Sequence, residues 1–229
     1  MTTPPAERAL PRVVAAELIG TGALVCAVVG SGVMAESLSG GNVAIALLAN
    51  TIATGAALVA LILTFAGVSG AHFNPVVTLV DALSRRPPVA EVVAVIGAQL
   101  AGGVVGVVVA HAMFELPFLQ SSLKARAGPG QWLAEIVATA GLVIVIAGVS
   151  RARPAAVPFA VACWIIAAYW FTASTSFANP AVTFARGLSD TFAGIRPGDV
   201  PAFIVAQLVG GGVGAGVARL LFPPASEPA

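Results

Sequence analysis

Six long apolar stretches constrain the fold more than any other feature of this sequence. They occupy roughly residues 13–35, 43–66, 89–113, 131–149, 155–173 and 200–222. A helix crosses the hydrocarbon core of a bilayer in about 20 residues, so each stretch is long enough to span. The mean hydropathy is +0.97 and 9% of the 229 residues are charged, too few for a soluble domain of this size. The sequence therefore predicts an all-α membrane protein.

The basic residues between these stretches predict how the chain is oriented. Seven arginines lie on one side, namely Arg8, Arg12, Arg85, Arg86, Arg151, Arg153 and Arg219. Four basic residues lie on the other, namely Lys124, Arg126, Arg186 and Arg196. The positive-inside rule then places both termini in the cytoplasm, in a multi-pass protein of the cell's inner (plasma) membrane. The net charge of +1 argues against nucleic acid as a partner.

The sequence repeats itself in the same order in its two halves. Glu17-x-x-x-Thr21 recurs as Glu135-x-x-x-Thr139, FNPVVT (73–78) resembles ANPAVT (178–183), and AQLAGGVVG (98–106) recurs as AQLVGGGVG (206–214). The halves, about 1–125 and 126–229, each hold three apolar stretches, so the second is inverted relative to the first. Inverted repeats form one unit with a shared site near the bilayer midplane. We therefore expect a single transmembrane domain over residues 1–229.

Each half contains an Asn-Pro pair followed by a short apolar segment, at 74–83 and 179–188. Ten helical residues rise about 15 Å, half of a hydrocarbon core of about 30 Å. Proline suits the first helical position and asparagine suits the cap. The preceding loops, GVSGAHF (67–73) and TASTSFA (172–178), are small and polar, as expected where irregular backbone lines a watery cavity. Two half-helices are predicted to meet at a pore, with the Asn74 and Asn179 amides and two positive helix ends at its centre.

These motifs resemble those of the aquaporin (major intrinsic protein) family over essentially the whole chain. The resemblance rests on the boxes Asn74-Pro75-Val76 and Asn179-Pro180-Ala181, on SGAHFNP (69–75) and on the two Glu-x-x-x-Thr spans. It implies a right-handed bundle of six tilted transmembrane helices plus two re-entrant half-helices, with one pore per subunit and a homotetramer in the lipid. Val76 replaces the family's usual alanine, and we expect this to narrow the pore little.

The resemblance also carries over four positions that form the family's selectivity filter. They are Thr54, Ala167, Ser176 and Val182, with Ala168 as a one-residue alternative to Ala167. Most members have arginine where Val182 stands, and water-selective members add histidine and an aromatic residue. A ring without these residues should be wide and only partly polar. It suits neutral hydroxyl-bearing solutes such as glycerol, urea or the hydroxides of arsenic(III) and antimony(III), with some water. The segment ANPAVTFARGLSDTFAGIRP (178–197) also resembles a bacterial branch often encoded beside arsenic-resistance genes.

Four charged residues need separate interpretations. Asp81 and Arg186 follow Asn74 and Asn179 by the same interval, which predicts an inner vestibule for Asp81 and an outer vestibule for Arg186. The favoured interpretation is a charge at each half-helix end, either anchored there or extending toward water. The alternative is that Arg186 displaces the filter arginine outward and makes the entrance positive. Glu17 and Glu135 are expected to accept hydrogen bonds from the backbone of the re-entrant loops.

Three other functions compete with a passive solute channel. The first is a water-selective aquaporin. The second is a proton-coupled secondary transporter, which would need a titratable coupling site such as Glu17, Glu135 or His72. The third is an intramembrane serine protease, since GVSG (67–70) matches a G-x-S-G pattern. The repeat accounts for that loop otherwise, so we expect no enzyme. We also expect no cofactor or metal, and we interpret Cys26 and Cys163 as free thiols in apolar runs.

Overall fold

The computed structural model describes residues 9–222, and all regular secondary structure in that range is helical. Arg8 and both chain ends therefore lie outside the described residues. The helices are α1 (Leu10–Leu38), α2 (Val43–Phe65), α3 (Pro75–Arg85), α4 (Val89–Met113), α5 (Pro129–Ala152), α6 (Val157–Phe171), α7 (Pro180–Arg186) and α8 (Val200–Leu221). Six helical segments of the described chain are long and apolar enough to cross a membrane, which matches the six predicted stretches. This is the all-α membrane architecture that the hydropathy predicted.

The two half-helices start where the Asn-Pro pairs predicted, but α7 is shorter than expected. α3 covers 11 residues, whereas α7 covers 7 and ends at Arg186 rather than near residue 188. The chain leaves the helix at Gly187, whose N–H bonds to Phe184 O at 3.1 Å. Residues after Gly187 then fold back, so that Ile195 N donates to the Arg186 carbonyl at 3.3 Å. Tertiary contacts of this following loop, which the local pattern does not contain, end the helix early.

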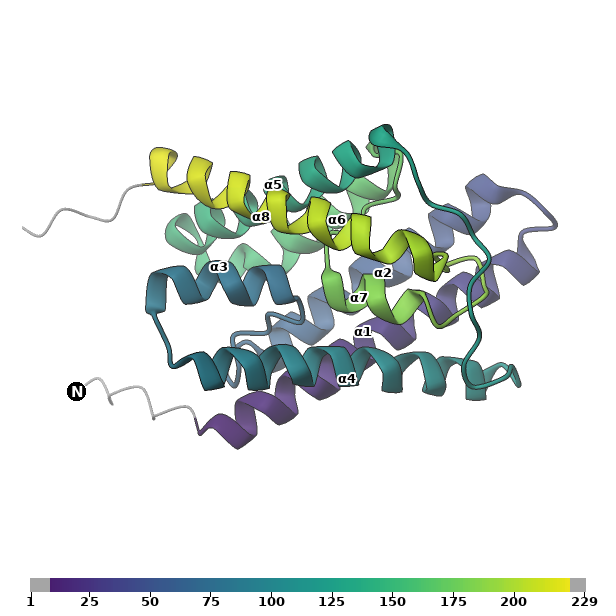
Figure 1. Ribbon diagram of the computed structural model, residues 1–229, viewed down its shortest axis with the longest axis horizontal. Coiled ribbons are helices and arrows are strands. Elements are labelled where there is room, and N and C mark those ends of the chain that lie inside the picture. The colour runs from purple at the N-terminus through teal and green to yellow at the C-terminus, as the bar shows by residue number, and fades with distance from the viewer. Residues whose placement is uncertain (1–8, 223–229) are drawn as a thin grey trace, which may run out of the picture.

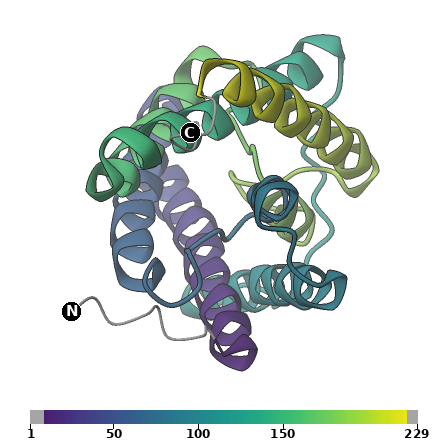
Figure 2. The same ribbon diagram turned by 90° about the vertical axis from the view of Figure 1, so that its left-hand side faces the viewer.

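The long helices form a ring with the half-helices inside it. α1 packs along α4, and α5 packs along α8, as the inverted repeat requires. Figure 1 shows α3 and α7 in the middle of the molecule, with their N-terminal ends turned toward each other. Seen from the end of the bundle, α3 lies inside the ring of long helices (Figure 2). Broken helices are thereby brought together at the centre of the membrane-spanning bundle.

Glycines let the paired helices approach closely. A Cβ on Gly102 of α4 would overlap the Leu18 carbonyl oxygen of α1, and the equivalent Gly210 of α8 lies against Ile136 of α5. Gly214 is equally confined, because its Cβ would lie 2.6 Å from Ala140 O and 2.8 Å from Val143 Cβ. Small residues at such crossings are the usual means of packing transmembrane helices. The repeated AQL-x-GG segments therefore serve helix packing.

A matched pair of glycine substitutions on α8 tests this packing. Gly214→Ala is expected to lower the stability of the detergent-solubilised protein by about 1–3 kcal/mol, because neither backbone nor Val143 can move aside without strain. Gly212 lies on the same helix, but an added Cβ there has no atom within 4 Å. Gly212→Ala should therefore leave the stability unchanged or raise it slightly. The midpoint of thermal unfolding measures both. Equal midpoints for the two variants would show that the crossing is not tightly packed.

Candidate functional site

The two Asn-Pro pairs meet at the centre of the bundle and bond to each other's loops. Asn74 Oδ1 accepts from Val76 N at 2.9 Å, and Asn179 Oδ1 accepts from Ala181 N at 3.0 Å, so both side chains cap their half-helices. Asn74 Nδ2 donates to Ala178 O at 2.8 Å, and Asn179 Nδ2 donates to Phe73 O at 2.7 Å. The reciprocal bonds were not foreseen from the sequence. They leave one hydrogen of each amide available to the space between the caps.

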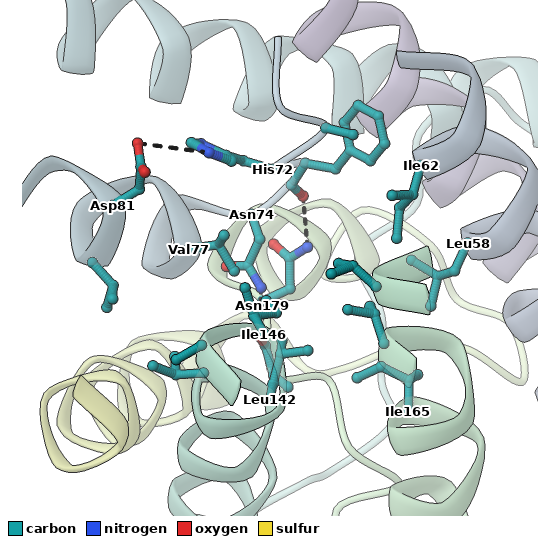
Figure 3. Close-up of a pocket in the computed structure, with 18 of the residues that line it drawn as sticks. Leu58, Ile62, His72, Asn74, Val77, Asp81, Leu142, Ile146, Ile165 and Asn179 are labelled. Carbon is teal, nitrogen blue, oxygen red and sulfur yellow. Dashed lines mark hydrogen bonds and ion pairs between the residues drawn. The ribbon is translucent and has the colours of Figure 1, made fainter. Parts of the chain in front are cut away.

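A cavity of about 710 Å³ runs past these two amides (Figure 3). Aliphatic side chains form much of its wall, and those labelled in Figure 3 are Leu58, Ile62, Val77, Leu142, Ile146 and Ile165. Polar groups lie along part of the lining, including Thr54, His72, Asn74, Ser176 and Asn179. The cavity therefore has an apolar side and a line of hydrogen-bonding groups.

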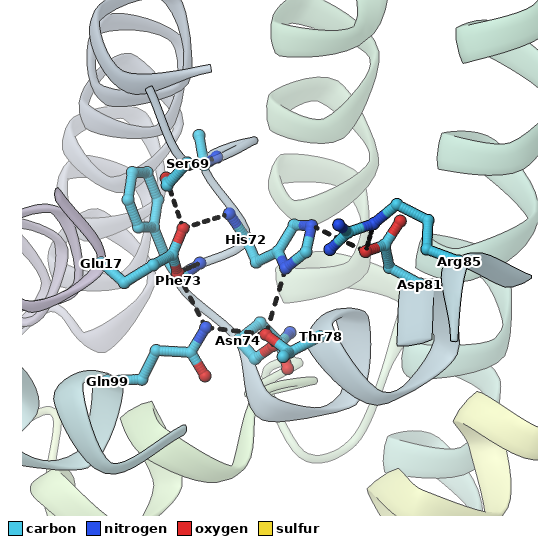
Figure 4. Close-up of polar contacts among 10 residues, drawn as sticks. Glu17, Ser69, His72, Phe73, Asn74, Thr78, Asp81, Arg85 and Gln99 are labelled. Atoms are coloured by element: carbon cyan, nitrogen blue, oxygen red, sulfur yellow. Dashed lines mark hydrogen bonds and ion pairs between the residues drawn. The ribbon is translucent and has the colours of Figure 1, made fainter. Parts of the chain in front are cut away.

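Glu17 holds the first re-entrant loop in place (Figure 4). Its carboxylate accepts from His72 N at 2.9 Å, Phe73 N at 2.7 Å and Ser69 Oγ at 2.6 Å. It also accepts from Gln99 Nε2 at 2.7 Å, and that amide reaches Thr78 Oγ1 at 2.9 Å. Glu17 is completely buried, and its oxygens satisfy donors that have no water to bond at this depth. The backbone hydrogen bonds predicted for this acid are present.

Glu135 makes the equivalent contacts in the second half. It accepts from Phe177 N at 2.9 Å, Ala178 N at 2.8 Å and Gln207 Nε2 at 2.6 Å. Gln207 Nε2 also lies 2.7 Å from Thr183 Oγ1. The glutamines were missed as partners of the acids, although the repeated AQL segments contain both of them. Their pairing with the repeated Glu-x-x-x-Thr spans was the available signal.

The loops before the caps have an unusual backbone that these acids support. Ala71 and Phe73 have φ of +53° and +48°, and the equivalent Ser176 and Ala178 have +48° and +49°. The left-handed region costs a residue with a side chain about 1 kcal/mol. Successive backbone N–H groups of each loop donate hydrogen bonds to its glutamate, and these bonds offset this cost. They turn the carbonyls of Phe73 and Ala178 toward the asparagines.

Three of the four filter positions taken from the resemblance line the cavity. They are Thr54, Ser176 and Val182, which are 3%, 2% and 5% exposed. The structure disagrees with the fourth, because Ala167 lies on the exposed face of α6 and does not line the cavity. Instead α6 presents Ile165 and Tyr169 there.

Tyr169 was therefore the missed member of this region. Its hydroxyl lies 3.4 Å from Thr54 Oγ1, and its side chain is 3% exposed. It is the single tyrosine of the sequence, which was the one signal that could have singled it out. Ser176 also lines the cavity, and its buried Oγ has no hydrogen-bond partner among residues 9–222. This part of the lining is more polar than the predicted ring with Ala167.

The third residues of the Asn-Pro boxes pack away from the cavity. Val76 is 2% exposed and lies against Gly211 of α8, where an added Cβ would overlap its methyl group. The Ala181 carbonyl oxygen lies 3.3 Å from the place of a Cβ on Gly103 of α4. Neither residue lines the cavity, so valine at position 76 takes no width from it.

The two vestibule residues occupy different environments. Asp81 pairs with Arg85, lies 3.8 Å from His72 Nε2 and is 30% exposed at one end of the cavity (Figures 3 and 4). Arg186 lines the cavity but is only 2% exposed. Its Nε donates to Ala193 O, and its guanidinium carbon lies 3.4 Å from the centre of the Phe177 ring. Arg186 is therefore anchored at the end of its half-helix, and it is not close to open water, because residues 187–196 fold back over it.

Within residues 9–222, no three His, Cys, Asp or Glu side chains gather closely enough to hold a metal ion. The acids at the centre, Glu17 and Glu135, accept hydrogen bonds from the loops. Around the two asparagines the passage is lined by neutral donors and acceptors, and charged side chains such as Asp81 and Arg186 lie farther along it.

Comparisons with known proteins agree with this architecture. The family model described as Major intrinsic protein matches residues 6–156. The chain is 53% identical to "Aquaglyceroporin AqpS" of Rhizobium meliloti (strain 1021) over 216 residues, covering 94% of this chain and 92% of that protein. It is 31% identical to "Aquaporin Z" of Photorhabdus laumondii over 92% of this chain and 97% of that protein.

A solved structure supports the fold independently. The X-ray structure of the aquaglyceroporin from Plasmodium falciparum superposes with a TM-score of 0.72 at 18% identity, covering 94% of this chain and 98% of that one. Such a low identity bears on the fold alone. The family model and the 53% identical relative carry the assignment: the chain belongs to the major intrinsic protein family, as its paired Asn-Pro boxes indicated.

Proposed function

We propose that this protein is a passive channel for small neutral solutes, with glycerol and the neutral hydroxides of arsenic(III) or antimony(III) as the expected classes and some water passing as well. The observation that carries the proposal is the two-sided lining of the cavity. Leu58, Ile165 and Val182 face it with aliphatic groups, while Ser176 and Tyr169 offer hydroxyls. A polyol has a hydrocarbon side and a hydroxyl side, so it can satisfy both walls at once.

Neutral solutes are favoured over ions by the centre of the pore. Asn74 and Asn179 begin helices whose positive ends point toward each other, and their amides are donors. Positive half-helix ends and fixed donors form an electrostatic barrier to protons and cations. Glu17 and Glu135 are engaged by loop donors, which favours a structural role over proton coupling.

Permeability of proteoliposomes tests this function. We expect glycerol and arsenous acid to cross at rates well above those of empty liposomes, with a modest water permeability, in stopped-flow light scattering. A pH gradient across the membrane should leave the solute rates unchanged, because no coupling step is involved. High water flux with exclusion of both solutes would favour a water-selective channel. Flux that follows the pH gradient would favour a transporter.

The relative named an aquaglyceroporin is consistent with a solute pathway of this kind. We further propose that four copies assemble side by side in the bacterial inner membrane, each with its own pore, as the family resemblance implies. We also propose that both termini face the cytoplasm, because arginine is in excess at the end of the bundle where α3 finishes. In this orientation Arg186 lies toward the outside of the cell and Asp81 toward the inside.

A further inference from the structure

Arg186 is fixed more firmly than a charge that merely ends a helix. It is the last residue of α7, one turn after Val182, and both line the cavity. Its Nε donates to Ala193 O, and its guanidinium stacks on Phe177. Its carbonyl accepts from Ser189 N at 3.4 Å and from Ile195 N at 3.3 Å.

The loop that holds Arg186 is itself tied to the segment between α4 and α5. Gln120 N donates to Leu188 O at 2.9 Å, and Arg196 N donates to Lys124 O at 2.7 Å. The same segment carries Arg126, which is 8% exposed and whose guanidinium carbon lies 4.9 Å from the Phe177 ring. Two arginines therefore contact one aromatic ring beside the cavity.

Arg126 uses its donors within the protein. Its Nε donates to Gly194 O at 2.8 Å and its Nη1 to Ser174 O at 3.2 Å, while its backbone N–H donates to Asp199 at 2.8 Å. It braces the loop on both sides of Phe177. Its side chain does not line the cavity.

Arg186 differs from Arg126 in this respect. No hydrogen bond joins either of its Nη atoms to a protein atom among residues 9–222, and none of the ion pairs there includes it. Guanidinium can donate five hydrogen bonds, and a nearly buried one without acceptors is costly. The donors left over lie on a side chain that lines the cavity, where a passing oxygen can accept from them.

The charged groups closest to the Arg186 side chain in this loop are cations. Lys124 and Arg126 both interact with it, and desolvation followed by the charges of Arg126 and Arg186 lowers the pKa of Lys124 to about 8. The nearby acids are occupied elsewhere, since Glu135 accepts from the second loop and Asp199 pairs with Arg196 at 2.8 Å. No described carboxylate neutralises Arg186 within ion-pair distance.

We propose that Arg186 is a specificity-determining residue of the pore: its free Nη donors bind solute oxygens at the α7 end of the cavity, and its charge repels cations there, a task that Val182 cannot perform. The inference rests on the proposed solute-channel function and extends it. A solute entering a narrow passage loses water, and donors fixed in advance replace that water. Because Phe177 and Ala193 O already hold the guanidinium, it loses little conformational entropy when it binds a solute oxygen.

Arg186→Met, which removes charge and donors at similar volume, tests the proposal in proteoliposomes. The ratio of glycerol to water permeability is expected to fall about tenfold, the effect of losing one hydrogen bond to a charged group. Leak of potassium or protons, followed with a potential- or pH-sensitive dye, should rise. Arg196→Met, which removes a cation at the same end that does not line the cavity, is the matched control and should change neither quantity.

Two further variants keep the proposal open to contradiction. Arg186→Lys retains the charge but not the planar fork, so it should exclude cations while lowering the solute-to-water ratio. Arg186→Met/Val182→Arg should regain cation exclusion, because a guanidinium returns one turn deeper in the same pore. If Arg186→Met folds and changes neither selectivity nor leak, Arg186 is only an anchor. If Arg186→Met does not fold, the test depends on Arg186→Lys. An unchanged ratio of glycerol to water permeability in that variant would also overturn the proposal.

The proposed function and this inference can fail separately. A wild-type protein that conducts water but no glycerol contradicts the solute-channel function, and the leak measurement then still decides whether Arg186 excludes cations. A wild-type protein that conducts glycerol, with the same selectivity in Arg186→Met, contradicts the role of Arg186 alone. Protein abundance in the vesicles, measured for each variant, converts every rate to a rate per channel.

Discussion

Glu135→Leu is expected to abolish solute conduction and to remove most of the folded protein from detergent extracts. The substitution leaves two backbone donors, Phe177 N and Ala178 N, without an acceptor, and it removes one of the two acceptors of Gln207 Nε2. Each unsatisfied buried donor costs about 1–3 kcal/mol, so together they are a large part of the stability of a typical domain. The left-handed backbone at Ala178 would lose its support as well.

A matched acid on another helix separates this effect from a general loss of charge. Glu36 lies exposed near the end of α1, and Glu36→Leu should give wild-type yield and conduction. Glu135→Gln retains one acceptor oxygen, so its yield and conduction should lie between those of Glu135→Leu and Glu36→Leu. Yield of monodisperse protein in size-exclusion chromatography and glycerol flux per channel are the measurements. A conducting, well-folded Glu135→Leu protein would show that the acid does not hold the loop.

Asn179→Asp is expected to lower solute conduction at neutral pH by at least about tenfold. The cap survives, because an aspartate oxygen can still accept from Ala181 N and Val182 N. The donation to Phe73 O is lost, and a carboxylate oxygen then faces that carbonyl in its place. Repulsion between the two acceptors, together with a charge at the midplane, should open the contact between the loops.

The pH dependence of this variant has a defined sign. A protonated aspartic acid can donate to Phe73 O again, so conduction should rise as the pH falls and decline as the carboxyl ionises. Asn42→Asp is the matched control, since Asn42 caps α2 in the same way at an exposed position. It should conduct normally at every pH. Normal conduction by Asn179→Asp at neutral pH would contradict the role assigned to the amide.

The helices, caps and loop acids could be predicted because each depends on local chemistry. Long apolar runs fix the spans, Asn-Pro fixes the start of α3 and α7, and an acid repeated in both halves points to a shared structural need. The assignment of Ala167 failed for a physical reason. α6 is apolar on nearly every side, so its sequence carries little information on which face turns toward the cavity, and Tyr169 was overlooked.

The surroundings of Arg186 could not be predicted for a different reason. Its burial depends on residues 187–196 folding back, and on their hydrogen bonds with residues around 120–126. These contacts join segments that are distant in sequence and lack a repeated counterpart in the first half. A comparison of the halves therefore placed Arg186 and Asp81 in similar settings, whereas one is buried and the other is partly exposed.

The crossed bonds between Asn74 and Ala178, and between Asn179 and Phe73, have a consequence for how the chain is made. When the ribosome has released only the first half, Glu17 can already order its own loop. The Asn74 amide then lacks its acceptor, Ala178 O, and the Phe73 carbonyl lacks its donor, Asn179 Nδ2. Those partners emerge only after the second Asn-Pro pair has been synthesised, and Gln207 of α8 follows later still. Until then, these polar groups are unsatisfied at bilayer depth, which costs free energy, so the first half alone is incompletely folded. A conducting pore is therefore assembled only once almost the entire polypeptide has been inserted, and a truncated product cannot form one.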